Sequence, residues 1–200
     1  MQKPKIDLNL AATLASEVEA AMKLNREGHH REARDALVRI KKVVADAGVE
    51  APFLCWCCAV VADALEDGEA ALRYATLAVN LDPCCAPYQN SRRIIIERIK
   101  NTVVYAPPRS KIVREYFGLL EQIGEVDGHA LYALAAHHVV VGDAPAALAV
   151  LDKLVLVADY PAIWETKAVV HDQLGEHGLA RDCRQRAAQL PAANVPPATA

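Results

Sequence analysis

Apolar residues recur along most of this chain at intervals of three or four positions. The clearest stretch, Leu65–Pro83, has small residues at Ala71, Ala75 and Ala78 with larger apolar residues between them. This period places the apolar positions on one face of an α-helix. An aspartate and a glycine open the stretch, and its final proline cannot continue a helix. We therefore predict an amphipathic helix whose slim face lets a second helix approach closely.

The same period predicts further helices up to about residue 190. Helix ends are indicated by turn residues and by proline, and helix starts by Ser110, Asp127 and Asp143, which are typical N-cap residues. The predicted helices include Leu8–Arg26, His30–Ala45 and Tyr88–Val104. We expect the chain to be all-α, with helix-pair boundaries near Gly28, Asp67, Pro107, Gly142 and Gly175.

Equivalent positions recur at a fixed period in the second half. Leu131 and Trp164 are 33 residues apart, and so are Ala147 and Ala180. Spacing and residue type together resemble the tetratricopeptide repeat, a helix-turn-helix unit of about 34 residues. The residues that match the family best are Trp164, Ala168, Gly175, Ala180 and Ala187. The resemblance covers roughly residues 8–190. It implies a right-handed superhelical solenoid of about five antiparallel helix pairs, of which the central pair lacks the alanine signature.

Length and composition are consistent with one helical domain. The chain has 200 residues, 53% of them hydrophobic, and a net charge of −3. We expect a repeat domain over residues 1–190 and a disordered tail rich in proline and alanine over 191–200. No apolar run approaches the roughly 18 residues needed to span a membrane, and the first ten residues do not resemble a signal peptide. We therefore expect a cytoplasmic protein without a membrane span, whose homo-oligomerisation remains open.

No catalytic motif is visible, so we expect neither an enzyme nor a cofactor. The cysteines allow two interpretations. Cys55 and Cys58 could join Cys84 and Cys85 in a four-thiolate zinc site, or they could be small buried apolar residues. We favour the second interpretation and expect reduced thiols without a metal. His138 and His171 occupy equivalent positions, where they could sense pH or bind a metal, but we expect them to replace one amphipathic ring by another.

The resemblance implies a concave groove, lined by first-helix side chains, that holds a partner peptide or helix. Trp56 is the most informative of these residues, because aromatic side chains anchor many interfaces. A neighbouring helix of the same chain could instead cover it. Mapped onto this sequence, the partner-binding groove comprises Phe53, Trp56, Val60, Asp63, His129, Tyr132 and Glu165.

A second candidate surface is basic. Between residues 92 and 114 seven basic residues stand against one acid, so this window carries +6 and the rest of the chain −9. The basic patch comprises Arg92, Arg93, Arg98, Lys100, Arg109, Lys111 and Arg114. We interpret the protein as a non-enzymatic scaffold or adaptor for a protein or peptide partner, similar to those of bacterial secretion or assembly machines. The alternative is an adaptor that binds an acidic protein, or less readily RNA, through the helical hairpin that carries these basic residues. The simplest interpretation is that the basic residues form a solvated helix face without a partner.

Overall fold

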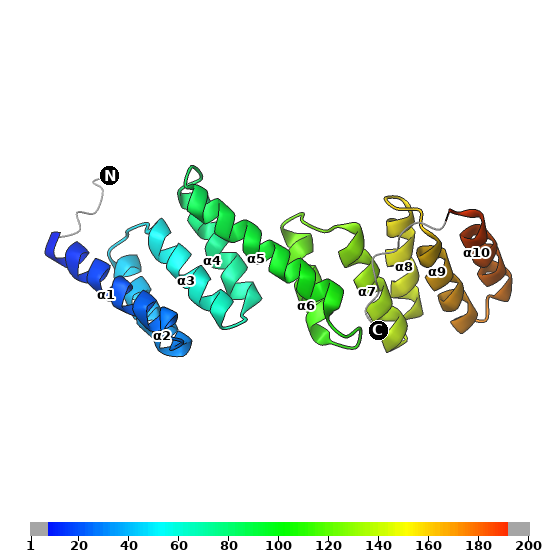
Figure 1. The fold of residues 1–200 in the computed structure, drawn as a ribbon, viewed down its shortest axis with the longest axis horizontal. Helices are drawn as coiled ribbons and strands as arrows, with labels where there is room; N and C mark the ends of the chain where they lie inside the picture. Colours follow the sequence, from blue (N-terminus) through cyan, green and yellow to red (C-terminus); the bar gives the residue numbers. More distant parts are fainter. Residues whose placement is uncertain (1–7, 192–200) are drawn as a thin grey trace. The chain divides into compact units, whose positions relative to one another are not determined.

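A computed structural model describes residues 8–191, and all regular structure within that range is helical, as predicted. Figure 1 shows the helices in chain order. They are α1 (Leu8–Arg26), α2 (His30–Asp46), α3 (Pro52–Ala64), α4 (Gly68–Leu81), α5 (Ala86–Tyr105), α6 (Lys111–Gln122), α7 (Gly128–Val141), α8 (Ala144–Val155), α9 (Pro161–Gln173) and α10 (His177–Gln189). No helix in the described range is both long and apolar enough to cross a membrane.

The two helices of each pair are joined at the predicted turns. The α7–α8 turn contains Gly142 with φ at 81°, and the α9–α10 turn contains Gly175 with φ at 76°. A residue with a side chain is strained in this left-handed conformation, which is why glycine ends these helices. The boundaries near Gly28, Asp67 and Pro107 are confirmed as well.

Side-chain caps fix the starts of four helices. The carboxylates of Asp67, Asp127 and Asp143 accept hydrogen bonds from backbone N–H groups three residues later, at 3.0, 3.0 and 3.2 Å. The Ser110 hydroxyl accepts from the N–H of Ile112 at 3.3 Å. Each cap satisfies an N–H group that has no partner inside its helix. The three N-caps predicted from sequence are therefore confirmed, and Asp67 opens α4 in the same way.

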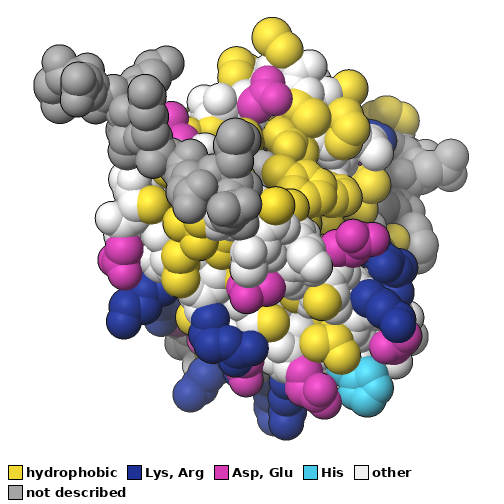
Figure 2. Space-filling model, turned by 90° about the vertical axis from the view of Figure 1, so that its left-hand side faces the viewer, with side chains coloured by type: hydrophobic (Ala, Val, Ile, Leu, Met, Phe, Trp, Pro, Cys, Tyr) yellow, Lys and Arg dark blue, Asp and Glu magenta, His cyan; other side chains and the backbone are white. Residues whose placement is uncertain are grey.

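The chain divides into two compact units, residues 1–97 and 98–200, which are described separately. In the first unit α1 packs against α2 and α3 against α4, with one buried cluster joining α1, α2 and α3. Ala33, Ala71 and Ala75 are almost completely buried, which lets the helices approach closely as predicted. In the view onto the end that carries α1 and α2, apolar side chains gather in the upper part and charged side chains along the lower edge (Figure 2).

In the second unit α7 packs against α8 and α9 against α10. Its main cluster joins α7, α8 and α9 around Ala135, Ala147, Leu151 and Leu154. The core of α6 uses larger residues instead, Val113, Phe117 and Leu120. The central pair thus lacks the buried alanines of its neighbours, as expected. The single domain over residues 1–190 stays a prediction, and all of the predicted tail except residue 191 lies outside the described residues.

Candidate functional site

The four predicted groove residues of the first unit lie on α3. Phe53, Trp56 and Val60 follow one side of this helix at intervals of three and four residues. The Phe53 ring is 52% exposed, and its centroid lies 5.6 Å from that of Trp56. Val60 and Asp63 are half-buried further along the helix. The structure therefore presents one large exposed aromatic side chain, supported by a second ring.

Trp56 is held in place by the start of α5. Its indole N–H donates a hydrogen bond to the Ser91 hydroxyl at 2.8 Å, and its ring lies 6.2 Å from that of Tyr88. The indole also packs partly against the buried cluster of α1, α2 and α3. This arrangement suits tryptophan, which combines a large apolar body with a single polar N–H group. The sequence left open whether Trp56 faces the groove or is covered by a neighbouring helix; in the structure the start of α5 leaves it half-buried, with Phe53 as the exposed ring.

Tyr132 in the second unit has the same relationship to the following first helix. Its hydroxyl lies 3.2 Å from the Thr166 hydroxyl, so α7 is linked to α9 as α3 is linked to α5. The separations are similar, 34 residues for Tyr132 and Thr166 and 35 for Trp56 and Ser91. Sequence reasoning missed the two hydroxyl residues. A serine or threonine one repeat after an amphipathic aromatic residue is the signal that could have indicated them.

The remaining groove residues of the second unit are not joined to one another. His129 and Glu165 are exposed, and their side chains make no hydrogen bond or ion pair with the residues of the described range. Asp172, further along the same helix as Glu165, accepts hydrogen bonds from His177 and Arg184 of α10. These contacts with α10 lower the pKa of its carboxyl group. Asp172 therefore stabilises the packing of α9 against α10.

The seven basic residues are divided between the units. Arg92 and Arg93 belong to the first unit, where Arg92 donates to the Thr76 hydroxyl at 3.3 Å. Lys100 belongs to the second unit and is neutralised by Glu125 at 3.5 Å and Asp127 at 3.7 Å. Of these seven residues, those that are exposed in the second unit are Arg98, Arg109, Lys111 and Arg114.

Three of those residues flank the start of α6. Arg109, Lys111 and Arg114 have no ion-pair partner between residues 8 and 191. We call these three residues the α6 basic edge. It is smaller than the patch of seven that the sequence suggested, because Arg92 and Arg93 lie in the first unit, Lys100 is paired with two acids, and Arg98 has an interaction of its own.

The cysteines of α3 are buried thiols. Burial raises the pKa of Cys57 to about 12 and that of Cys58 to about 11, and it also raises the pKa of Cys55. Cys55 packs in a cluster with Ala78, whereas Cys57 and Cys58 join the core with α1 and α2. Thiolates are the form that binds metal. Within the described residues no group of three or more potential ligands could hold a metal ion.

Trp164, one of the residues that match the repeat pattern best, helps to link α9 to α10. Its indole N–H donates to one carboxylate oxygen of Asp159 at 2.5 Å, and Arg186 of α10 donates to the other at 2.5 Å. The ammonium group of Lys167 lies 5.0 Å from the centre of the indole ring. The same ammonium donates to Asp152 of α8 at 2.6 Å, which ties α9 to both neighbours.

No protein-family model and no curated protein matches this chain. Among solved structures, MamA from Desulfovibrio magneticus RS-1 is 14% identical and covers 88% of this chain and 93% of its own, with a TM-score of 0.38. MamA of AMB-1 is 9% identical with coverages of 90% and 92% and a TM-score of 0.40. TTC0263, a thermophilic TPR protein of Thermus thermophilus, is 15% identical with coverages of 87% and 89% and a TM-score of 0.41.

The helix pairs themselves carry the predicted repeat: the glycine turns at Gly142 and Gly175 are 33 residues apart, and Asp143 and Glu176 directly follow them at the start of the next helix. The described residues therefore have a tetratricopeptide-like fold.

Proposed function

We propose that this protein is a non-enzymatic interaction scaffold that holds a partner peptide or helix against the side of α3 carrying Phe53. The observation that carries the proposal is that Phe53, one of only two phenylalanines in the chain, is 52% exposed instead of buried in the core. An exposed aromatic ring on a rigid support is typical of the anchors that dominate protein interfaces.

The support beneath Phe53 is well ordered by its contacts. Trp56 is fixed by its hydrogen bond to Ser91 and by packing against Tyr88, so the surface around Phe53 needs little reorganisation when a partner binds. Val60 extends the same stripe by about two turns of helix. A partner with an apolar side chain could therefore cover Phe53 and part of Trp56 together.

The experiment compares proteins captured from the native host by three forms of the full chain. Phe53→Ala removes the exposed ring, and Val38→Ala is the matched control, because Val38 is 53% exposed on α2 of the same unit. Proteins retained by the wild type and by Val38→Ala but lost with Phe53→Ala are the expected result. If all three forms capture the same proteins equally, the face of α3 is not the binding surface.

The α6 basic edge supports a second candidate function, the binding of an acidic protein segment. Two of its residues are arginines, which bind carboxylates in a bidentate manner, and all three side chains lack an acidic partner between residues 8 and 191. Three cations match a short acidic segment better than RNA, because nucleic-acid sites typically neutralise about six to ten phosphates. The net charge of −3 also disfavours RNA.

The two candidate surfaces differ in their response to salt. Capture through the α6 basic edge should weaken steeply as the salt concentration rises, whereas capture through Phe53 should change little. The variant Arg109→Ala with Arg114→Ala tests the edge, and Arg181→Ala on α10 is the control for an exposed arginine elsewhere in the same unit. Salt-sensitive capture that survives the double substitution would exclude the edge.

A further inference from the structure

Two histidines occupy the same place in successive helix pairs of the second unit. His138 lies near the end of α7 and His171 near the end of α9, 33 residues later. Each is followed five residues on by an acidic residue that starts the next helix. In both turns the backbone N–H of that residue donates to the carbonyl of the histidine, from Asp143 at 2.9 Å and from Glu176 at 2.8 Å. The two turns are therefore matched in backbone geometry.

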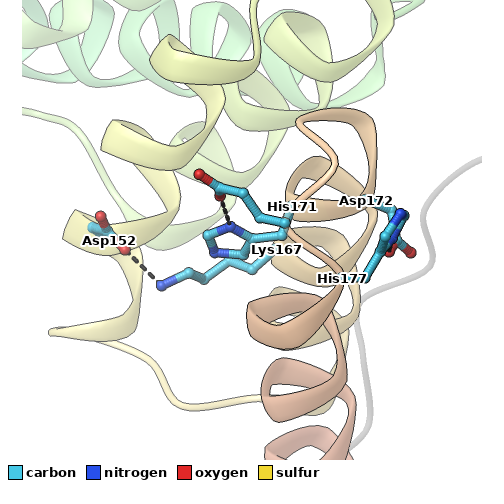
Figure 3. Close-up of polar contacts among 6 residues, drawn as sticks. Asp152, Lys167, His171, Asp172 and His177 are labelled. Carbon is cyan, nitrogen blue, oxygen red and sulfur yellow. Dashed lines mark hydrogen bonds and ion pairs between the residues drawn. The ribbon is translucent and has the colours of Figure 1, made fainter.

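The side chains of the two turns differ. Nδ1 of His171 lies 2.7 Å from Oε2 of Glu176, within hydrogen-bond distance. Figure 3 shows this contact beside the Lys167–Asp152 pair, with His177 and Asp172 apart from them. Glu176 makes no side-chain cap, so its carboxylate is available to the imidazole. A protonated His171 would meet a carboxylate at close range.

His138 has no such partner. Its Nδ1 lies 3.7 Å from Oδ2 of Asp143, which is too far for a hydrogen bond. The shorter Asp143 side chain is held at the start of α8, where Oδ1 accepts from the N–H of Ala146. Nδ1 of His138 is consequently buried without a hydrogen-bond partner among the described residues. Protonation would bury a positive charge and an N–H group with no close acceptor.

The surroundings of His138 oppose a positive charge as well. The His137 ring packs edge-on at 5.6 Å, and Arg114 of α6 lies near enough to repel an imidazolium. Burial, followed by these two neighbours, lowers the pKa of His138 below its ordinary value of 6.5, although Asp143 acts in the opposite direction. His137 is itself buried, and its Nδ1 contacts the carbonyl of Pro108 in the turn before α6. His137 thus lies where α7 meets the turn before α6, and its ring packs against that of His138.

We propose that this joint between α6 and α7 is an acid-sensitive switch, in which protonation of His138 places a cation beside Arg114 and His137 and loosens the packing of α6 against α7. Because the opened joint binds a proton more readily than the closed joint, the closed form is fully favoured above about pH 6.5 and loses this advantage as the pH falls below it. At the matched turn, a carboxylate lies within hydrogen-bond distance of His171, so a proton added there has an acceptor and we do not expect this turn to open in the same way.

Hydrogen exchange of the full chain at about pH 7.5 and about pH 5.5, corrected for intrinsic exchange rates, tests the switch. We expect the backbone amides of α6 and α7 to lose protection by about threefold to tenfold at the lower pH, while those of α9 and α10 keep theirs. Tenfold is the upper limit because pH 5.5 lies about one unit below the ordinary imidazole pKa, and one unit is tenfold in an equilibrium constant. His138→Gln should abolish the loss, and His171→Gln should leave it unchanged. A wild-type joint whose protection is independent of pH would overturn the proposal.

The exposed Arg114 gives a second variant that does not alter the core. Arg114→Gln removes the repelling cation and should reduce the acid-induced loss of protection, and NMR titration should show the His138 imidazole gaining its proton at higher pH. If His138→Gln fails to fold, these two measurements decide. An unchanged loss of protection in Arg114→Gln, together with an unchanged titration of His138, contradicts the proposal.

Discussion

The indole nitrogen of Trp56 on α3 donates a hydrogen bond to the Ser91 hydroxyl on α5 over 2.8 Å. This contact joins two successive first helices of the repeat. Tyr132 and Thr166 repeat it between α7 and α9 at 3.2 Å. In each unit an amphipathic aromatic residue therefore stabilises the stacking of first helices through its polar atom, while its ring forms part of the helix surface.

Removing the hydroxyl partner of Trp56 should destabilise the first unit. Ser91→Ala leaves the half-buried indole N–H without its acceptor, which costs about 1 kcal/mol in the free energy of unfolding. Ser91→Thr keeps a hydroxyl and should cost less. Chemical denaturation of the three proteins measures the difference. Equal midpoints for Ser91→Ala and the wild type would mean that water replaces the hydroxyl without loss.

Trp56→Ala should cost more than the loss of the hydrogen bond alone. The indole packs against Phe53, Tyr88 and the core of α1, α2 and α3, so truncation removes buried apolar contacts. We expect a loss of about 2 to 3 kcal/mol, somewhat below the usual cost for a fully buried aromatic residue. A thermal midpoint equal to that of the wild type would show that the α5 contacts contribute nothing.

Alanine substitutions at two glycines should change the stability of the protein in opposite directions. Gly142 has φ at 81°, so Gly142→Ala strains the turn and should destabilise by about 1 kcal/mol. Gly118 lies inside α6, and a Cβ atom added there meets no atom within 4 Å. Gly118→Ala should therefore stabilise by about 0.5 to 1 kcal/mol. Thermal unfolding of both variants tests the pair, and a stabilising Gly142→Ala would contradict the assigned turn.

The thiols should differ widely in reactivity. Cys84 is exposed, whereas the pKa of Cys57 is raised to about 12 by burial. At neutral pH an alkylating reagent should modify Cys84 within minutes and Cys57 only after unfolding. Because the folded chain keeps the Cys57 proton above pH 9 and the unfolded chain releases it, stability should fall as the pH rises beyond the ordinary thiol pKa of 9.0. Mass spectrometry of the labelled sites measures the first effect, and rapid labelling of native Cys57 would exclude its burial.

The helix boundaries could be predicted because their signals are local. Gly142 adopts a left-handed conformation that other residues avoid. Asp143 caps α8 by accepting a hydrogen bond from the N–H group three residues later. Neither signal depends on distant parts of the chain. The burial of the alanines could be predicted for a similar reason, since their spacing places them on one helix face.

The covering of Trp56 could not be predicted, because it depends on which residues begin α5. That helix lacks the repeat signature, so the sequence did not show that Tyr88 and Ser91 would lie against the indole. The pairing of Lys100 with Glu125 and Asp127 was hidden for the same reason, since it joins residues 25 or more apart without a motif. Long-range side-chain partners are set by packing, which periodicity alone does not specify.

The affinity of a captured partner for three purified forms of the chain tests the scaffold proposal most directly. Titration calorimetry should show Phe53→Ala binding about thirtyfold more weakly than the wild type, equivalent to about 2 kcal/mol for an aromatic anchor. Its unfolding midpoint should stay close to that of the wild type, because the lost ring is 52% exposed. Val38→Ala should bind like the wild type. Equal affinity of Phe53→Ala and the wild type would contradict the assignment of the partner to α3.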